Sequence, residues 1–193
     1  MILGGGKAKR LGKDKPTLKI GDKLIIERQC QGFKKLCSEV IFVTNEEPSF
    51  NVSGIKVFFD EVPYRGPVGG ILTGLRNSSN YNNIIVAGDM PFVNLKLVKS
   101  LVCKIGKYDA VIPYSNSGLE PLMAIYTKNC IPAMEESFKK NNLRMVSFLK
   151  DIRVKYVNKG EIEKIDPGFF SFFNINSTED LIRAKEIIEK AGN

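Results

Sequence analysis

The sequence opens with Met1-Ile-Leu-Gly-Gly-Gly-Lys-Ala-Lys-Arg-Leu-Gly-Lys-Asp-Lys-Pro16. Three apolar residues predict a short strand, and the three glycines after them predict a loop whose backbone N–H groups can approach a ligand closely. The same loop carries basic side chains that supply charge for an anion, namely Lys7, Lys9, Arg10, Lys13 and Lys15. Together these features indicate a polyphosphate site.

Two well-known phosphate motifs do not fit this loop. A P-loop has four residues between its glycines, followed by Lys and then Ser or Thr. Here five residues separate Gly6 from Gly12, and the pair that follows is Lys-Asp. The dinucleotide pattern G-x-G-x-x-G matches Gly4 and Gly6 but has Lys9 in place of its last glycine. The loop is therefore a cation-rich glycine loop of another kind.

Length and composition restrict the classes of protein to consider. The 193 residues carry a formal net charge of +8 and include no histidine, which excludes His-based acid–base catalysis, Ser-His triads and His-ligated zinc. One domain, residues 1–193, is expected. No apolar run approaches the roughly 20 residues of a membrane span, and no signal peptide pattern is present. We expect a cytoplasmic protein with no membrane partner.

Apolar runs alternate with helical patterns along the whole chain. The runs predict strands at residues 1–3, 40–44, 55–59, 83–87, 108–113, 121–126 and 154–157. Helical spacing and capping residues predict helices at 24–36, 71–77, 95–105, 132–140 and 145–150, and from Ser177 onward. A glycine-rich loop is expected at 66–70 and a buried extended segment at 169–173. This alternation predicts an α/β fold, with three layers around a doubly wound, mostly parallel sheet.

Polar and glycine-rich groups follow directly on the ends of predicted strands. They are Gly4–Gly6, Asn45, Asp60, Gly66–Gly70 and Asp89. Ligands of such sheets bind beyond the carboxyl ends of the strands, so we expect these groups to share one site.

Asp89 is the strongest candidate metal ligand. It stands between a buried strand and Met90-Pro91, and a carboxylate in that place, facing a polyphosphate loop, is an expected ligand of Mg²⁺. The alternative is a turn aspartate that caps the next helix. By itself, Asp60 is more typical of a solvated turn and Lys15 of a surface lysine. Asn174 and Asn176 are two residues apart, so their side chains share one face of an extended segment.

The opening stretch Leu3-Gly-Gly-Gly-Lys-Ala-Lys-Arg-Leu-Gly-Lys-Asp-Lys15 resembles the L-A-G-G-x-S/A-x-R-M-G-x-D-K signature of nucleotidyltransferases, most closely the molybdenum cofactor guanylyltransferases. The similarity continues in order along nearly the whole chain. The further motifs are Gly66-Pro-Val-Gly-Gly70, Gly88-Asp-Met-Pro91, Glu120-Pro-Leu122, Arg144 and Phe173-Asn-Ile-Asn-Ser-Thr-Glu-Asp-Leu181.

The resemblance implies a Rossmann-like fold of the nucleotide-diphospho-sugar transferase type. It implies transfer of GMP from GTP to the terminal phosphate of molybdopterin, with Mg²⁺ as cofactor. The nucleotide would be contacted by Leu3, Gly4, Gly5 and Asp60, its triphosphate by Arg10 and Lys15, and the metal by Asp89. Molybdopterin would be contacted by Arg144, Asn174 and Asn176, and Asn45 falls near a further family asparagine.

This chain departs from the family pattern in two ways. Gly4 and Leu11 stand where Ala and Met are usual. Only Met1 and Ile2 precede Leu3, whereas family members usually have several more residues there. A strand typically has about five or six residues, so we expect either an unusually short first strand or a native chain that begins upstream of Met1.

Several other functions remain open from the sequence. The same fold supports cytidylyl transfer to molybdopterin and guanylyl transfer in cobalamin synthesis. From other classes, the chain could be a non-catalytic nucleotide-binding protein or a basic RNA-binding domain. The dispersed lysines and the lack of an RNA-binding motif argue against a nucleic-acid partner.

Overall fold

The fold is that of a computed structural model, which describes residues 1–4, 7–8, 13–61 and 66–192. Its strands are β1 (Ile2–Leu3), β2 (Lys7–Ala8), β3 (Lys13–Asp14), β4 (Lys19–Ile20), β5 (Lys23–Leu24), β6 (Ile41–Thr44), β7 (Lys56–Phe59), β8 (Asn82–Ala87), β9 (Ala110–Ser115), β10 (Gly118–Leu119), β11 (Met123–Thr127) and β12 (Val154–Val157). Its α-helices are α1 (Ile25–Phe33), α2 (Gly66–Asn77), α3 (Leu95–Cys103), α4 (Ile131–Lys139), α5 (Lys159–Glu163) and α6 (Thr178–Gly192). Short 3-10 helices are η1 (Lys15–Thr17), η2 (Lys128–Cys130), η3 (Leu149–Asp151) and η4 (Phe170–Phe172).

The main sheet has the strand order β10-β9-β11-β8-β1-β6-β7, and β12 also pairs with β9. Parallel pairs join β1 to β6 and β8, β6 to β7, and β12 to β9, whereas β11 is antiparallel to both β8 and β9. The chain leaves the central strand β1 in both directions, which makes the carboxyl end of β1 a topological switch point. The mostly parallel, doubly wound sheet predicted from the sequence is confirmed.

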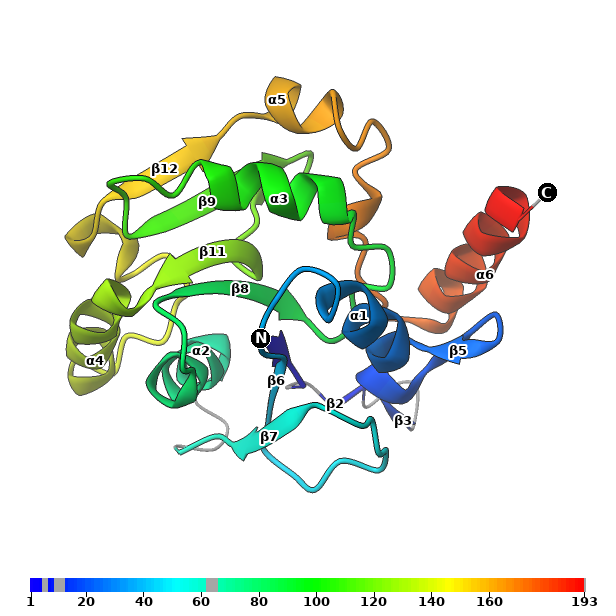
Figure 1. The fold of residues 1–193 in the computed structure, drawn as a ribbon, viewed down its shortest axis with the longest axis horizontal. Helices are drawn as coiled ribbons and strands as arrows, with labels where there is room; N and C mark the ends of the chain where they lie inside the picture. Colours follow the sequence, from blue (N-terminus) through cyan, green and yellow to red (C-terminus); the bar gives the residue numbers. More distant parts are fainter. Residues whose placement is uncertain (5–6, 9–12, 62–65, 193) are drawn as a thin grey trace.

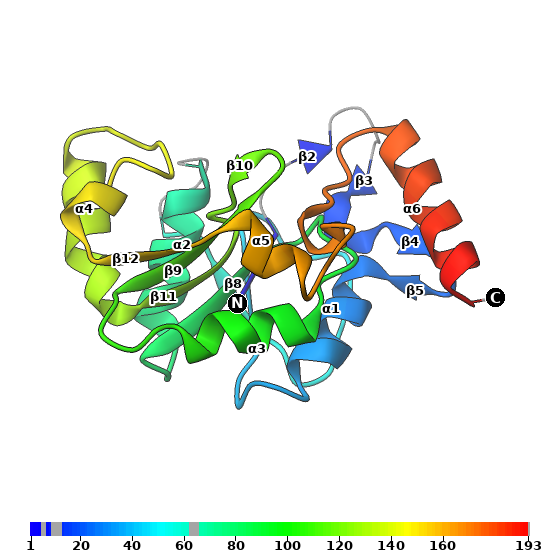
Figure 2. The same ribbon diagram turned by 90° about the horizontal axis from the view of Figure 1, so that it is seen from above.

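Helices cover both faces of this sheet (Figures 1 and 2). On one face α1, α3 and α5 pack against a cluster that contains Ile2, Phe42 and Val86. On the other face α2 and α4 pack against Leu3, Val43 and their neighbours. Neighbouring residues of a strand thus serve opposite faces, as the period of two requires. Such two-sided burial explains why the parallel strands were visible as continuous apolar runs.

The short hairpin of β4 and β5 lies beside the last helix, α6, at one end of the molecule (Figure 1). Leu18, Ile20 and Ile25 share a small buried cluster there with Ile175 and Ala184. This cluster joins the segment that follows the opening loop to the C-terminal segment, and so brings Lys15 and Asn176 into the same neighbourhood.

The predicted helix starts are confirmed where a capping side chain marks them. The side-chain oxygen of Asn94 accepts a hydrogen bond from Lys96 N at 2.9 Å and caps α3. At α6 the Ser177 hydroxyl accepts from Asp180 N at 3.1 Å, and the Asp180 carboxylate accepts from Ser177 N at 2.9 Å. Aspartate therefore completes this capping box in place of the usual Glu.

The segment expected to be extended at 169–173 forms the 3-10 helix η4 instead. The carboxylate of Asp166 accepts hydrogen bonds from Phe170 N at 3.2 Å and Ser171 N at 2.8 Å, which folds the backbone into a turn. Phe169 accordingly has a left-handed φ of 51°, and the Phe170 ring is 42% exposed. The expectation was wrong because the Asp166 carboxylate, four and five residues earlier in the chain, overrides the β propensity of the phenylalanines.

Other boundaries also differ from the sequence expectations. The expected glycine-rich loop at 66–70 is the first part of α2, which Pro67 near its start favours. The helix expected at 145–150 is reduced to η3, and the sequence did not indicate α5 or the two-residue strand β10. Strand β1 is only two residues long although it is central.

Among the described residues, no helix is both long enough and apolar enough to cross a bilayer.

Candidate nucleotide site

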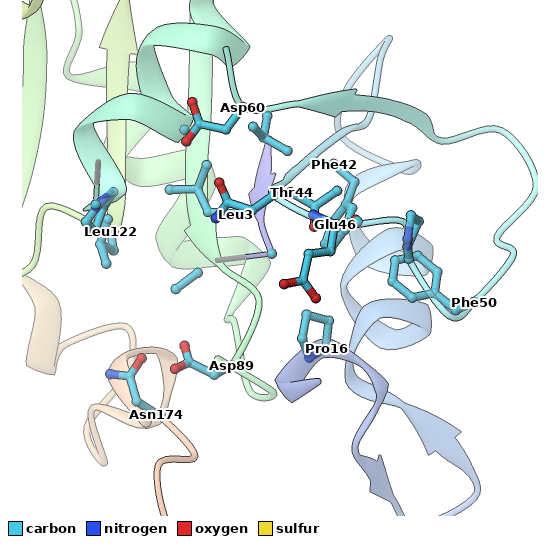
Figure 3. Close-up of a pocket in the computed structure, with 18 of the residues that line it drawn as sticks. Leu3, Pro16, Phe42, Thr44, Glu46, Phe50, Asp60, Asp89, Leu122 and Asn174 are labelled. Atoms are coloured by element: carbon cyan, nitrogen blue, oxygen red, sulfur yellow. Dashed lines mark hydrogen bonds between the residues drawn. The ribbon is translucent and has the colours of Figure 1, made fainter. Parts of the chain in front are cut away.

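A cavity of about 870 Å³ opens at the carboxyl ends of β1, β6 and β8 (Figure 3). Its size suits a nucleotide-sized ligand. It is lined by Leu3, Gly4, Pro16, Phe42, Val43, Thr44, Asn45, Glu46, Glu47, Pro48, Phe50, Asp60, Gly66, Pro67, Gly70, Ala87, Asp89, Leu122, Asn174 and Asn176. The strand-end groups predicted to share one site are thus brought together, as far as the structure describes them.

The turn that follows β8 carries Asp89. Met90 N donates to Ala87 O at 3.2 Å, so residues 87–90 form a four-residue turn with Asp89 in its third position. Gly88 N donates to Leu3 O at 2.9 Å, and Ile175 N donates to Asp89 O at 3.0 Å. A Cβ on Gly88 would lie 2.8 Å from Pro16 Cγ and 2.9 Å from Leu3 O. Only glycine therefore allows the turn to lie against the opening strand.

Lys15 connects the opening loop to this turn. Its Nζ donates to Asp89 Oδ2 at 2.8 Å and to Asn176 Oδ1 at 2.5 Å. The side chains of Lys15 and Asp89 are each 15% exposed. Lys15 thus differs from an ordinary surface lysine, because its ammonium is held between two groups that line the cavity.

The second carboxylate oxygen of Asp89 has a different environment. Asp89 Oδ1 is buried and has no hydrogen-bond partner among the described residues. A buried acceptor without a donor is costly, and a cation that binds there would remove the cost. The described residues contain no cluster of three or more His, Cys, Asp or Glu side chains suited to a metal. A single carboxylate fits Mg²⁺, which commonly binds one or two carboxylates together with substrate phosphates.

Asp60 lies across the cavity from Asp89 (Figure 3). It is 8% exposed, and its Oδ1 accepts from the Thr73 hydroxyl at 3.1 Å. Gly69 allows this packing, because a Cβ there would lie 3.0 Å from Asp60 Oδ2. Asp60 is therefore a buried, oriented carboxylate in the cavity wall and not the solvated turn that it resembles in isolation.

Sterics explain why position 4 of this chain is glycine where alanine is usual in the family. Gly4 N donates to Val43 O at 2.7 Å, which draws the opening loop onto β6. A Cβ on Gly4 would lie 2.2 Å from Phe42 Cζ. The Phe42 ring, packed edge-on against Phe50 with centroids 5.0 Å apart, thus fills the space that the usual alanine would take.

The motif at 120–122 contributes to the site through its backbone. The Ser115 hydroxyl donates to Glu120 Oε1, and burial raises the pKa of the Glu120 carboxyl above its ordinary value. Leu122 lines the cavity, and its carbonyl accepts from Ala87 N at 3.0 Å. The motif therefore supports the start of the Asp89 turn.

Not all predicted site residues lie in the cavity. Arg10 and Gly5 fall outside the residues that the structure describes. Arg144 is exposed on the segment between α4 and η3 and is not among the residues that line the cavity. Asn174 lines the cavity next to Asp89 (Figure 3), and its amide donates to Phe172 O at 3.0 Å.

Sequence reasoning identified Asn45 after β6 but missed the wall that continues from it. That wall consists of Glu46, Glu47, Pro48 and Phe50. The strand-end rule could have indicated it, because these residues continue the loop that begins with Asn45 after β6. Phe42 gave no such signal, since it looked like an ordinary core residue, and Leu122 was indicated only by the family motif at 120–122.

The described wall of the cavity is rich in carboxylates, which are Glu46, Glu47, Asp60 and Asp89. Positive potential comes from Lys15 beside Asp89, and from the N-terminus of α2, whose Gly66 and Pro67 line the cavity. Helix N-termini attract phosphates. An anionic nucleotide next to these carboxylates needs cations, and a metal on Asp89 would supply one.

The sheet is doubly wound and has a nucleotide-sized cavity at its switch point. In this cavity Lys15 is hydrogen-bonded to Asp89, whose other carboxylate oxygen has no partner among the described residues. These features fit the class of nucleotidyltransferases. Residues 1–154 match the model of the MobA-like NTP transferase domain. The chain belongs to this family.

Individual relatives agree with that family. A probable molybdenum cofactor guanylyltransferase of Natranaerobius thermophilus is 34% identical over 98% of this chain and 96% of its own length. One of Pelotomaculum thermopropionicum is 31% identical over 99% and 93%. A crystal structure of molybdopterin-guanine dinucleotide biosynthesis protein A from Archaeoglobus fulgidus superposes with a TM-score of 0.84 at 28% identity and covers 98% of this chain and 97% of its own. The resemblance stated from the sequence is confirmed.

Proposed function

We propose that this protein transfers GMP from GTP to the terminal phosphate of molybdopterin, with Mg²⁺ as cofactor and release of pyrophosphate. The names of the relatives support the substrates. One observation in this chain supports the chemistry best. The Asp89 carboxylate binds Lys15 through one oxygen, while its other oxygen is buried without a partner among the described residues.

Described groups on several elements would hold the nucleotide. Leu3 and Gly4 line the cavity, and Gly4 allows a ligand to lie close to the backbone. The N-terminus of α2 would attract phosphate oxygens, and the oriented carboxylate of Asp60 would accept hydrogen bonds from the nucleoside. Arg10 and Gly5 remain expected contacts of the triphosphate and the nucleotide on the strength of the family motif.

Asp89 would hold Mg²⁺ through its open oxygen, together with phosphate oxygens of the substrate. When bound, the metal would supply positive charge to the triphosphate and to the departing pyrophosphate. Lys15 would then direct its ammonium, a compact point charge, at the same phosphates. Its position between Asp89 and Asn176 keeps it within reach of both the metal ligand and the acceptor side of the cavity.

The reaction requires no general base. A terminal phosphate oxygen of molybdopterin forms a bond to the α-phosphorus of GTP, and the bond from that phosphorus to the bridging oxygen breaks, with its electron pair leaving on pyrophosphate. The attacking oxygen is already anionic near neutral pH, so no proton has to be removed. The protein's task is to bring two anions together in line and to stabilise the leaving group.

Asn174 and Asn176 are our proposed contacts for molybdopterin. Both line the cavity on the same side as Asp89, where an acceptor could approach the α-phosphate. Arg144 is a more distant proposed contact, since its exposed segment lies outside the cavity lining.

The test is transfer of label from α-labelled GTP to molybdopterin by the purified protein with Mg²⁺, with α-labelled CTP in a parallel reaction. We expect labelled dinucleotide from GTP at a rate at least tenfold above that from CTP, and none without a divalent metal. Efficient transfer from CTP alone would assign a cytidylyltransferase instead. No transfer to molybdopterin from either nucleotide, by protein that binds GTP, would reject the proposed acceptor.

A further inference from the structure

Gln29 lies beneath the turn that carries Asp89. It projects from α1 and is 4% exposed, next to the apolar cluster that contains Cys30 and Met90. Its Nε2 donates to Ala87 O and to Met90 O, both at 2.8 Å. These two carbonyls belong to the first and last residues of the turn, so a single side-chain amide joins both of its ends.

The orientation of this amide follows from its partners. Both partners are carbonyl oxygens, which only accept hydrogen bonds, so the NH₂ group must face them. The other end of the amide, Gln29 Oε1, is buried without a partner among the described residues. An amide in an apolar cluster with one end unpaired is a poor way to stabilise a core. Its geometry suits a different purpose, which is to fix the turn.

Hydrogen bonds from several separate parts of the chain hold this turn. Gly88 N bonds to Leu3 O, Asp89 O accepts from Ile175 N, and the Gln29 amide closes the turn from the helix side. The bonds to Leu3 and Ile175 hold the turn to its neighbours, whereas the Gln29 amide fixes the distance between the carbonyls of Ala87 and Met90. The direction of the Asp89 side chain depends on that separation, because Asp89 lies inside the turn.

We infer that Gln29 is a positioning residue for the metal ligand: its amide holds Ala87 and Met90 so that the open oxygen of Asp89 faces the metal. This inference rests on the proposed function, since it takes Asp89 as the ligand. Groups that orient a metal ligand without touching the metal typically change affinity or activity by about 10- to 100-fold when they are removed. Gln29 acts here through the backbone on both sides of the ligand.

Strand β8, whose carboxyl end leads into the Asp89 turn, provides a matched control at its amino end. Asn83, near the start of β8, is 7% exposed, and its Nδ2 donates to the carbonyls of Asn80 and Tyr81 at 3.0 and 3.2 Å. It is also a buried amide that donates to two backbone carbonyls. It lies at the end of β8 opposite to the cavity. Loss of Asn83 should therefore lower stability without affecting metal binding.

The experiment compares wild type, Gln29→Met, Asn83→Leu and Asp89→Asn. Mn²⁺ replaces Mg²⁺ as the probe, in the presence of a GTP analogue whose α,β-bridge is a methylene group and whose concentration is kept below that of the protein, so that Mn²⁺ held by free nucleotide does not mask binding at the site. Free Mn²⁺ is measured by electron paramagnetic resonance, and the unfolding midpoint is recorded for each variant. We expect Gln29→Met to bind Mn²⁺ about tenfold more weakly or worse, and Asn83→Leu to bind it as wild type does at a comparable loss of stability.

Equal Mn²⁺ affinity in Gln29→Met and wild type would overturn the inference, provided that Asp89→Asn loses the metal. Unchanged affinity in Asp89→Asn would instead remove the metal assignment, and the inference with it. If Gln29→Met does not fold, Gln29→Asn keeps the amide but shortens its reach to the two carbonyls. An intermediate loss of Mn²⁺ affinity in that variant supports the inference, and wild-type affinity contradicts it.

Discussion

Two partly buried aspartates, at opposite ends of the sheet, use their carboxylates differently. Asp89 follows the carboxyl end of β8, and Asp109 precedes the amino end of β9, which runs in the same direction because β11 is antiparallel to both strands. Their side chains are 15% and 10% exposed, and each has a cationic partner, Lys15 at 2.8 Å and Arg153 at 2.9 Å.

The difference lies in the second oxygen. In Asp109, one oxygen accepts from Arg153 N and Nε and the other from Arg153 Nη2 and Asn129 Nδ2, so both are satisfied within the protein. In Asp89, only Oδ2 has a described partner. This contrast supports a structural role for Asp109 and our proposal that Asp89 binds the metal. Burial and charge pairing alone do not distinguish the two roles, whereas a count of the hydrogen bonds at each oxygen does.

Replacement of Asp89 should have the largest effect on activity. Asp89→Asn keeps the shape of the side chain but weakens its hold on a metal, so we expect the rate of guanylyl transfer to fall by roughly 100-fold or more. The unfolding midpoint should stay close to that of wild type, because the lost charge has only one described partner. Label transfer and a thermal melt on the same preparation measure both effects. A variant with near-normal transfer would contradict the metal assignment.

Replacement of Lys15 should have the next largest effect. Lys15→Met removes the ammonium at similar length, and a charge-assisted hydrogen bond to phosphate is worth about 1.5–3 kcal/mol, so kcat/KM for GTP should fall roughly 10- to 100-fold. Lys23→Met is the control, since Lys23 is a nearby lysine whose described contact is with Gln31. Steady-state kinetics of both variants gives the comparison. Equal kcat/KM values in the two variants would show that the Lys15 ammonium does not contribute to the reaction.

Replacement of Asp109 should change stability and leave activity intact. Asp109→Asn breaks up the ion pair with Arg153 and leaves a buried amide among donors. We expect a loss of about 1 to 3 kcal/mol in the free energy of unfolding and an unchanged transfer rate per folded molecule. Urea unfolding and label transfer check the two parts. A tenfold loss of transfer in folded protein would place Asp109 in the site and abolish its contrast with Asp89.

Asp109 should also make a smaller contribution to how the stability of the protein depends on pH. Hydrogen bonds from the Arg153 guanidinium hold the pKa of the Asp109 carboxyl well below its ordinary value. The unfolded value is about 3.9, so this contribution is fully present above that pH and is lost as the pH falls towards the lower folded value. The stability difference between wild type and Asp109→Asn should thus be constant from about pH 7 to 5 and shrink below about 4. Urea melts across that range test it; a difference that grows on acidification would refute it.

The sequence predicted those features that local patterns encode. The parallel strands were visible as apolar runs, the starts of α3 and α6 as capping residues, and the cavity as groups at strand ends. Asp89 could be singled out because a rigid strand and a proline enclose it. Lys15 could not be told from the other lysines by local chemistry, and only its family motif distinguished it.

Features that depend on contacts between distant segments were missed. The need for glycine at position 4 arises from the ring of Phe42, which lies on β6. Gln29 looked like one polar residue on a helix, yet its partners are about sixty positions away along the chain. No periodicity or motif carries that information, because it arises only when α1 packs beneath the end of β8.

The most direct measurement of the contrast between the two aspartates is a crystal structure with Mn²⁺ and a non-cleavable GTP analogue, with anomalous scattering used to locate the metal. We predict a manganese peak at coordination distance from Asp89, with the triphosphate next to Lys15 and no peak at Asp109. A nucleotide bound in the cavity with its manganese on residues other than Asp89 would contradict the account.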